Sequence, residues 1–162
     1  MHTRSIRSYV YLTAGLGLLA SIYAGLETLY SGLRGSCTIN AFFSCSAVSE
    51  SGRTTTLGIP DAAIGIAGFV LILIVAALSE QHRQEFRYLY ALLFFTTGGV
   101  AFASYFAYIE LAQIHAVCPV CTTAYVFGVL VWVGAIALAL RLRKRLRKAG
   151  VPVPPAVPES VD

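Results

Sequence analysis

The sequence has few charged residues and few cysteines. Only 12% of its 162 residues are charged, and only four are cysteine. Soluble globular domains have about a quarter of their residues charged. In contrast, 57% of this chain is hydrophobic and its mean hydropathy is +0.71. The shortage of charge therefore argues against a soluble domain and favours an integral membrane protein.

Aromatic residues are missing from the main basic cluster, RLRKRLRK, between Arg141 and Lys148. A nucleic-acid surface would interleave aromatic side chains with the basic ones, so that bases could stack on them. The cluster directly follows an apolar segment, which is typical of a cytoplasmic anchor attracted to anionic lipid. The net charge of +4 therefore predicts contact with membrane lipid and no nucleic-acid partner.

Four apolar segments are long enough, or nearly long enough, to cross a bilayer, which takes roughly 20 residues as a helix. The first is longer than the roughly 7–15 residues of a signal-peptide core and no clear cleavage site follows it, so we expect a retained helix. The sequence predicts an all-α integral membrane protein, a four-transmembrane-helix bundle with a long outer loop that carries a cysteine pair. The expected helices are Tyr9–Tyr30, Ala62–Leu78, Tyr88–Leu111 and Cys118–Leu140.

The distribution of Lys and Arg predicts the orientation of the bundle. Ten of the twelve basic residues precede the first segment, lie between the second and third, or follow the fourth, and only Arg34 and Arg53 lie elsewhere. Cytoplasmic connections carry the excess of Lys and Arg. We therefore expect a multi-pass protein of the cell membrane with both termini in the cytoplasm. The Ser31–Pro60 loop and the turn at Cys118 then face the periplasm or exterior.

The chain divides into two parts by composition. Residues 1–140 hold the four apolar segments and form the expected membrane domain. Residues 141–162 hold the basic anchor and the proline-rich end VPVPPAVPESVD. We expect this end to be disordered, because it cannot bury enough apolar surface to offset the entropy of ordering.

All four cysteines belong to the predicted outer side, where the compartment is normally oxidising. Cys37 and Cys45 lie in the long loop, and Cys118 and Cys121 lie at the start of the fourth segment. On a helix, positions i and i+3 share a face with Cβ atoms about 5–6 Å apart, near the reach of a disulfide. Pro119 suits a first helical turn. The helix dipole there favours thiolate, so this pair has the character of a redox-active site.

Three interpretations of the four cysteines remain open from the residues alone. A disulfide in the loop can exchange with a second pair held on the helix, through a mixed disulfide. The second interpretation is a four-cysteine zinc site in a metal-binding or sensor protein, although structural zinc sites usually combine two short C-x-x-C pairs. The third is a structural subunit with two inert disulfides. A bridge between i and i+3 of one helix constrains little, so we favour the redox relay and predict no metal.

The combination of these features resembles the vitamin K epoxide reductase family. The shared features are four helices, Cys37 and Cys45 eight positions apart in the outer loop, and Cys118-Pro119-Val120-Cys121 followed by Tyr125. The resemblance extends over roughly Tyr9–Leu140 and points to a prokaryotic-type homologue without a fused thioredoxin domain.

The resemblance implies a disulfide-forming oxidoreductase that uses a quinone of the menaquinone, ubiquinone or vitamin K type. Cys121 would lie next to the quinone ring and Cys118 would bridge transiently to Cys45. The Cys37–Cys45 pair would take electrons from a separate thioredoxin-fold partner on the outer side. An alternative with the same flow of thiol electrons is a vitamin K epoxide or quinone reductase that recycles vitamin K.

The resemblance also suggests quinone contacts. These are Tyr125, one helical turn beyond Cys121, Ser51, which matches a serine or threonine that the family places in this loop, and Asp61, which departs from the family pattern. Many members have asparagine where Asp61 stands, and an ionised aspartate cannot donate a hydrogen bond. Asp61 is therefore either protonated by burial or a helix-start residue that favours the dipole.

Three further ionisable residues lie near the outer ends of the first and third segments. They are Glu27, Glu110 and His115. Ionisable groups in membranes are often proton relays, and quinone reduction consumes protons. Because these residues lie close to the interface, we expect them to be solvated.

Overall fold

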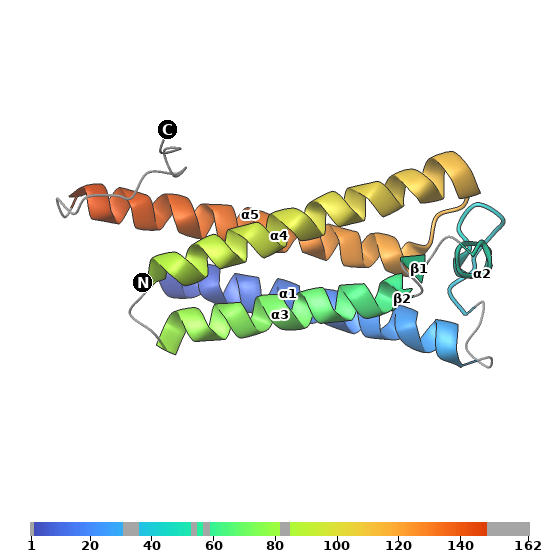
Figure 1. Ribbon diagram of the computed structural model, residues 1–162, viewed down its shortest axis with the longest axis horizontal. Helices are drawn as coiled ribbons and strands as arrows, with labels where there is room; N and C mark the ends of the chain where they lie inside the picture. The colour runs from blue at the N-terminus through green and yellow to red at the C-terminus, as the bar shows by residue number, and fades with distance from the viewer. Residues whose placement is uncertain (1, 31–35, 53–54, 57–58, 82–84, 149–162) are drawn as a thin grey trace, which may run out of the picture.

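Four long helices form an elongated bundle in the computed structural model (Figure 1). The structure describes residues 2–30, 36–52, 55–56, 59–81 and 85–148. All four helices are long and apolar enough to cross a membrane. The predicted four-helix membrane bundle is therefore confirmed. The helices are α1 (His2–Leu29), α3 (Asp61–Gln81), α4 (Glu85–Ile109) and α5 (Pro119–Lys148).

The helix ends differ from the predicted ones, most at the end of α5 and at the start of α1, which begins at His2 rather than at Tyr9. The fourth helix begins at Pro119 rather than at Cys118 and continues to Lys148, eight residues beyond Leu140. Arg and Lys are good helix formers, so the basic cluster can extend the helix beyond its apolar part. After Ile109, α4 continues into a short π-helix, η2 (Glu110–Ile114).

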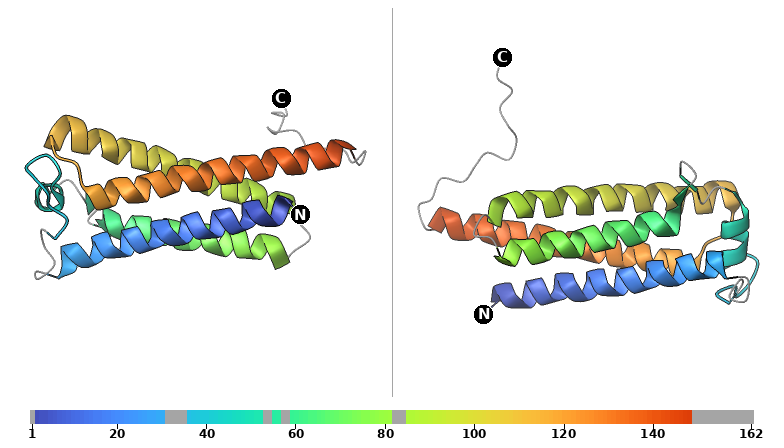
Figure 2. Two further views of the ribbon diagram at one scale, coloured as in Figure 1. Left: turned by 180° about the vertical axis from the view of Figure 1, so that it is seen from behind. Right: turned by 60° about the horizontal axis from the view of Figure 1, so that its bottom comes forward.

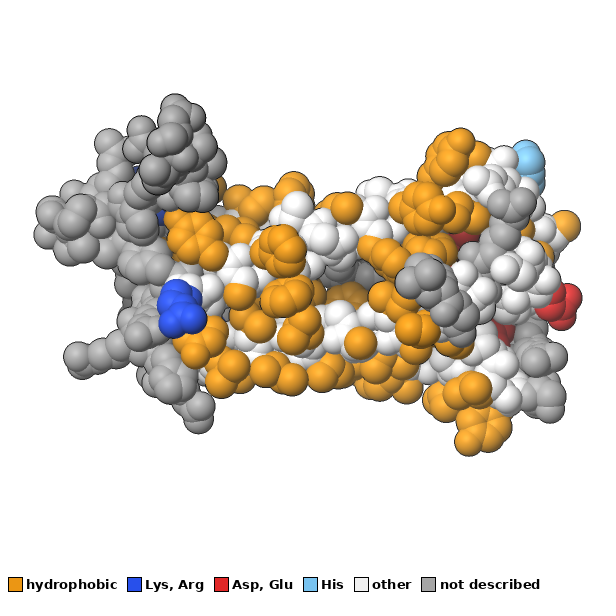
Figure 3. Space-filling model, in the orientation of Figure 1, with side chains coloured by type: hydrophobic (Ala, Val, Ile, Leu, Met, Phe, Trp, Pro, Cys, Tyr) orange, Lys and Arg blue, Asp and Glu red, His pale blue; other side chains and the backbone are white. Residues whose placement is uncertain are grey.

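The centre of the bundle is a small apolar core to which all four long helices contribute. Val131 of α5 is fully buried there. The other members are Val10, Ala14, Phe69, Ile72, Val75, Leu92 and Ala135. Many large apolar side chains instead point outward and cover the middle of the bundle (Figure 3). Such a surface would promote aggregation in water but is suited to contact with lipid tails.

Glycines allow α1 to approach its neighbours closely. A Cβ atom built on Gly17 of α1 would collide with the ring of Phe69 of α3. A Cβ atom on Gly134 of α5 would lie 2.9 Å from Cγ2 of Val10. Small residues at such crossings are typical of membrane helices, which associate by close packing rather than by the hydrophobic effect.

The loop between α1 and α3 closes one end of the bundle, opposite to the N-terminus (Figures 1 and 2). It contains a short helix, α2 (Cys45–Glu50), which the sequence analysis did not predict. Ser44 caps this helix, because its Oγ accepts a hydrogen bond from the Ala47 N–H at 3.1 Å. Two two-residue strands, β1 (Thr55–Thr56) and β2 (Ile59–Pro60), pair antiparallel before α3.

Backbone hydrogen bonds join this loop to the turn before α5. Phe43 and Val117 form a parallel bridge. The Val117 N–H donates to the Phe42 carbonyl at 2.7 Å, and the Ser44 N–H donates to the Val117 carbonyl at 3.1 Å. These bonds place the residues next to Cys45 against the residue next to Cys118.

Candidate active site

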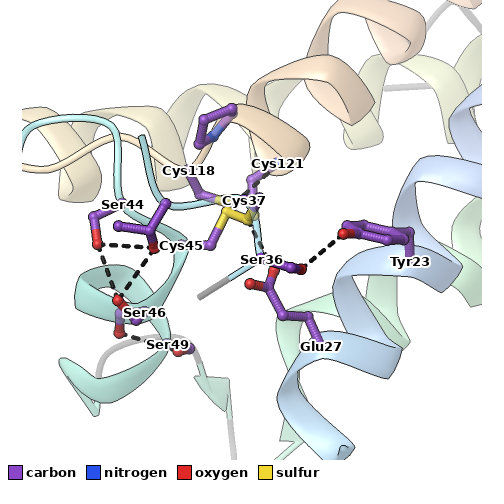
Figure 4. The surroundings of a disulfide bond; sticks show 12 residues. Tyr23, Glu27, Ser36, Cys37, Ser44, Cys45, Ser46, Ser49, Cys118 and Cys121 are labelled. Carbon is purple, nitrogen blue, oxygen red and sulfur yellow. Dashed lines mark hydrogen bonds between the residues drawn. A yellow bond between two sulfur atoms is a disulfide. The ribbon is translucent and has the colours of Figure 1, made fainter. Parts of the chain in front are cut away.

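The two cysteine pairs meet at the closed end of the bundle (Figure 4). Cys37 and Cys45 form a disulfide, and their Cα atoms are 5.8 Å apart. Cys118 and Cys121 are free thiols. The Sγ of Cys118 lies 3.3 Å from the Sγ of Cys45, although the residues are 73 positions apart. The structure therefore brings a thiol against a disulfide, which is the contact that exchange requires.

Local packing isolates this contact from water. Cys45 and Cys118 are each only 4% exposed, and Val48 and Ala116 pack against them. Cys37 is less buried than either. Cys37 is thus the more exposed residue of the disulfide, whereas Cys45 is buried.

The position of Cys118, directly before α5, favours its thiolate. The pKa of the Cys118 thiol is lowered below its ordinary value, chiefly because the Cys121 side chain hydrogen-bonds to its sulfur. The Cys121 backbone N–H adds a second hydrogen bond, at 3.2 Å. Burial acts in the opposite direction but does not prevail. This agrees with the thiolate-favouring helix start that the sequence predicted, and the thiolate is the form that attacks disulfides.

Removing the Cys121 side chain should therefore change the pH at which Cys118 reacts. We expect Cys121→Ala to move the pH profile of Cys118 alkylation to higher pH, because the largest cause of its lowered pKa is lost. The measurement is the iodoacetamide rate at Cys118 against pH, resolved by mass spectrometry, with Cys45 replaced by Ala in both proteins to keep Cys118 free. A profile that is unchanged, or that moves to lower pH, would contradict the assignment.

Two glutamates lie buried beside the cysteines. Glu27 of α1 is 7% exposed, and its Oε2 lies 2.9 Å from the Sγ of Cys37. Glu110 is 4% exposed and accepts hydrogen bonds from the Tyr125 hydroxyl at 3.0 Å and the Cys118 N–H at 3.1 Å. The expectation that Glu27 and Glu110 are solvated is wrong, because the loop between α1 and α3 covers this end of the bundle. His115 is exposed, as expected.

A mainly apolar cavity of about 370 Å³ lies between the helices next to Cys121. Asp61, Cys121 and Tyr125 all line it, together with aromatic residues such as Phe69 and Phe102. A second cavity of about 250 Å³ shares these three residues and extends to Cys45, Cys118 and Glu110. Cys121 thus lies between the other sulfurs and the larger cavity.

This larger cavity has the properties that a quinone needs. Its volume lies within the roughly 300–1,000 Å³ of small-molecule sites. Apolar walls suit a flat ring with a hydrocarbon tail, and polar side chains in the lining are few. Tyr125 can offer a hydroxyl and Asp61 a carboxyl group to carbonyl oxygens. Asp61 is also the first residue of α3, so both interpretations of this residue fit its position.

Ser51 is placed differently from the other two expected quinone contacts. Its Oγ donates to the Val48 carbonyl at 2.7 Å, which closes the end of α2. Among the described residues, it does not line either of the two cavities next to Cys121.

The sulfur cluster also bears on the zinc interpretation. The sulfurs of Cys37, Cys45 and Cys118 lie within 4.8 Å of one another, and Cys121 is not part of this group in the described chain. Structural zinc is almost always held by four ligands, as thiolates where they are cysteines. The disulfide leaves Cys37 and Cys45 without thiolates. The described cluster is therefore better suited to thiol exchange than to zinc.

Comparison with known families agrees with this geometry. The family model described as Vitamin K epoxide reductase family matches residues 9–136, which is most of the chain. The matched range contains all four cysteines, both glutamates and the residues that line the larger cavity. The chain therefore belongs to the vitamin K epoxide reductase family, a family of quinone-linked thiol oxidoreductases, and is a multi-pass membrane protein.

Proposed function

We propose that this protein generates disulfides by passing electrons from a thiol partner to a membrane quinone. The observation that carries the proposal is the 3.3 Å contact between Cys118 and Cys45, with Cys121 facing the cavity on the other side. The electrons pass from the partner to Cys37 and Cys45, then to Cys118 and Cys121, and finally to the quinone.

The difference in burial between Cys37 and Cys45 supports the order in which the two sulfurs react in the first exchange. The partner's thiolate attacks the sulfur of Cys37, the more exposed residue of the pair, and Cys45 leaves as a thiolate. A second partner thiol then releases Cys37, so that the partner becomes a disulfide and the loop pair becomes a dithiol. Cys45 is left facing Cys118.

The second exchange moves the electrons inward. The Cys45 thiolate attacks Cys118 in a Cys118–Cys121 disulfide, forms a Cys45–Cys118 bond and releases Cys121. Cys37 then attacks Cys45, which restores the loop disulfide and frees Cys118. The arrangement in the structure, with a loop disulfide and two free thiols at Cys118 and Cys121, matches the product of these steps.

The bound quinone would supply an acceptor for two electrons and two protons. Cys121 lies at its cavity, Tyr125 and Asp61 are the proposed polar contacts, and Ser51 stays a weaker prediction. A dithiol gives up its electrons only to an acceptor of higher potential, and a quinone in the bilayer is such an acceptor.

The proposed partner is a thioredoxin-fold protein on the outer side of the cell membrane. The distribution of basic residues supports this sidedness. Arg87 at the start of α4 and Arg141 in the last part of α5 lie at the end of the bundle opposite to α2. That end would face the cytoplasm and anionic lipid, together with both termini.

Quinone reduction in lipid vesicles tests this function. Purified protein with dithiothreitol should reduce added menaquinone, seen as loss of the quinone absorbance. We expect Tyr125→Phe to lower this activity at least about 10-fold, because the lost hydrogen bond to a quinone oxygen is alone worth about 1–1.5 kcal/mol. Thr123→Ala, on the exposed face of the same helix turn, is the matched control.

Two outcomes would overturn the proposal. One is about one zinc per chain with no dithiol-driven quinone reduction, which would support a metal-binding protein. The other is reduction of a vitamin K epoxide with little turnover of the quinone itself, which would support the recycling reductase.

A further inference from the structure

The carboxyl group of Glu110 joins two parts of the site that the relay leaves unconnected. Its Oε1 accepts a hydrogen bond from the Tyr125 hydroxyl at 3.0 Å. Its Oε2 accepts one from the backbone N–H of Cys118 at 3.1 Å. One side chain therefore contacts both the C-x-x-C turn and the proposed quinone contact, and thiol exchange itself does not use it.

The backbone holds Glu110 firmly in this position. The helix changes from α to π at this residue, and single π-turns are frequent at functional sites. The Ala116 N–H donates to the Glu110 carbonyl at 3.2 Å. The turn ends at His115, which has a left-handed φ of 57°. The π-turn thus aims the carboxyl group at Tyr125 and Cys118 instead of continuing the face of α4.

We propose that Glu110 carries a proton between the Cys118–Cys121 dithiol and Tyr125 during quinone reduction. This inference rests on the proposed function. Closing the dithiol into a disulfide releases two protons with the two electrons, and the acceptor takes up two protons. If Tyr125 gave up its proton alone, it would leave a buried phenolate, which is costly. Glu110 is close enough to replace that proton directly.

The transfer balances as follows in atoms and charges. When Cys118 and Cys121 form their S–S bond, both S–H bonds are lost and one proton moves to the Glu110 carboxylate. The protonated carboxyl donates to the Tyr125 oxygen, so that the Tyr125 proton is available to the acceptor in the cavity. Glu110 ends as a carboxylate and Tyr125 as a phenol. The second thiol proton, and the proton for the second acceptor oxygen, exchange with outer solvent.

The smaller cavity provides the path from sulfur to carboxyl group. Glu110, Cys118 and Cys121 line it together, and its volume of about 250 Å³ leaves room for water. Proton transfer through a single water is effective in acid–base catalysis. The other carboxyl groups at this cavity are those of Glu27, Glu50 and Asp61. Glu27 contacts Cys37 and Glu50 is exposed, whereas Glu110 contacts Tyr125 and Cys118.

Glu110→Gln removes the transferable proton of this side chain but keeps its size and shape. The glutamine oxygen can accept from the Cys118 N–H while its NH₂ group donates to the Tyr125 oxygen, so both contacts persist without a transferable proton. We expect single-turnover menaquinone reduction to slow about 10²-fold, in the range for the loss of an acid–base group. Glu110→Asp, which still carries a proton, should recover part of this rate. Gln113→Ala, at an exposed residue of the same π-turn that lines neither cavity, should keep the wild-type rate.

A second readout does not depend on quinone. Without quinone, the proton that Glu110 takes up has no acceptor in the larger cavity. Infrared difference spectra between the dithiol form and a disulfide form made with a chemical oxidant should therefore show a carboxyl band that Glu110→Gln lacks and Gln113→Ala retains. The rate at which Cys118 attacks the loop disulfide should stay within about two-fold of wild type, because Glu110→Gln keeps the hydrogen bond to the Cys118 N–H.

The outcomes separate the two proposals. If the wild-type protein does not reduce menaquinone, the proposed function fails, and the infrared band still tests Glu110. If the wild type is active and Glu110→Gln matches it, the proton-carrying role is overturned while the function stands. If Glu110→Gln slows thiol exchange as much as quinone reduction, or leaves the carboxyl band in place, Glu110 is only a structural residue.

Discussion

Cys121→Ala is expected to abolish quinone reduction and to trap a Cys45–Cys118 disulfide. The Sγ of Cys118 already lies 3.3 Å from the Sγ of Cys45, so its thiolate can attack the loop disulfide directly. Without Cys121, only Cys37 can resolve the bridge, and alkylation of the free Cys37 during thiol trapping keeps the bridge in place. Loss of an essential nucleophile costs on the order of 10³–10⁶ in rate, so activity should fall to background.

Non-reducing mass spectrometry of trapped thiols measures this bridge. Peptides that contain Cys45 and Cys118 should be cross-linked in Cys121→Ala, and Cys37 should then be free. Thr123→Ala serves as the matched control, because Thr123 is exposed on the first turns of the same helix. Full activity in Cys121→Ala, with no cross-link to Cys45, would show that the relay is wrong.

Cys45→Ala is expected to divide the relay into two halves. Reduction of menaquinone driven by reduced thioredoxin, used as a protein thiol donor, should fall to background, because no loop sulfur then faces Cys118. Reduction driven by dithiothreitol should persist within a few-fold, because a small dithiol can reduce a Cys118–Cys121 disulfide directly. Rates of quinone absorbance loss with the two donors measure the difference.

Cys37→Ala is the control for Cys45→Ala. Both variants lose the same disulfide, which closes a short loop, so both should lose about 2–3 kcal/mol of stability in the chain-entropy account. Only Cys37→Ala keeps the sulfur that meets Cys118, and it should form the Cys45–Cys118 bridge. If thioredoxin drives Cys45→Ala as fast as wild type, electrons do not pass through Cys45.

The membrane architecture could be predicted from the sequence because solvent determines it locally. A run of about 20 apolar residues favours a helix in lipid wherever it lies in the chain, since its backbone must satisfy its own hydrogen bonds. The ends were less predictable. The basic residues after Leu140 continue α5 in the same helical conformation, and hydropathy alone does not register that continuation.

The loop was the least predictable part of the fold. The helix α2 has only six residues, and its cap depends on the bond from the Ala47 N–H to Ser44 Oγ. So short a helix is marginal by itself, and its stability comes from packing. Here the packing comes from the cluster around Cys45 and Cys118 and from the bridge between Phe43 and Val117.

In the candidate site, too, local features could be predicted from the sequence and features that depend on tertiary packing could not. Spacing and helix position were enough to predict Cys118 and Cys121 as a redox-active pair, because the dipole and the i, i+3 geometry are local properties. The burial of Glu27 and Glu110 was mispredicted, because both lie close to the ends of their apolar segments and were therefore expected to contact solvent. The loop between α1 and α3 closes the end of the bundle at which both residues lie, and the path of a loop is not a local property.

By itself, the sequence determined four membrane helices, the resemblance to a family and the gathering of four cysteines at one end. Each follows from the local preference of a segment for lipid, water or a side of the membrane. Only the tertiary structure decided that Cys118 faces Cys45, that Cys121 faces the cavity, and that Glu110 joins Tyr125 to Cys118. These contacts join residues on separate elements, so they depend on the path of the loop and on a π-turn that no local pattern revealed.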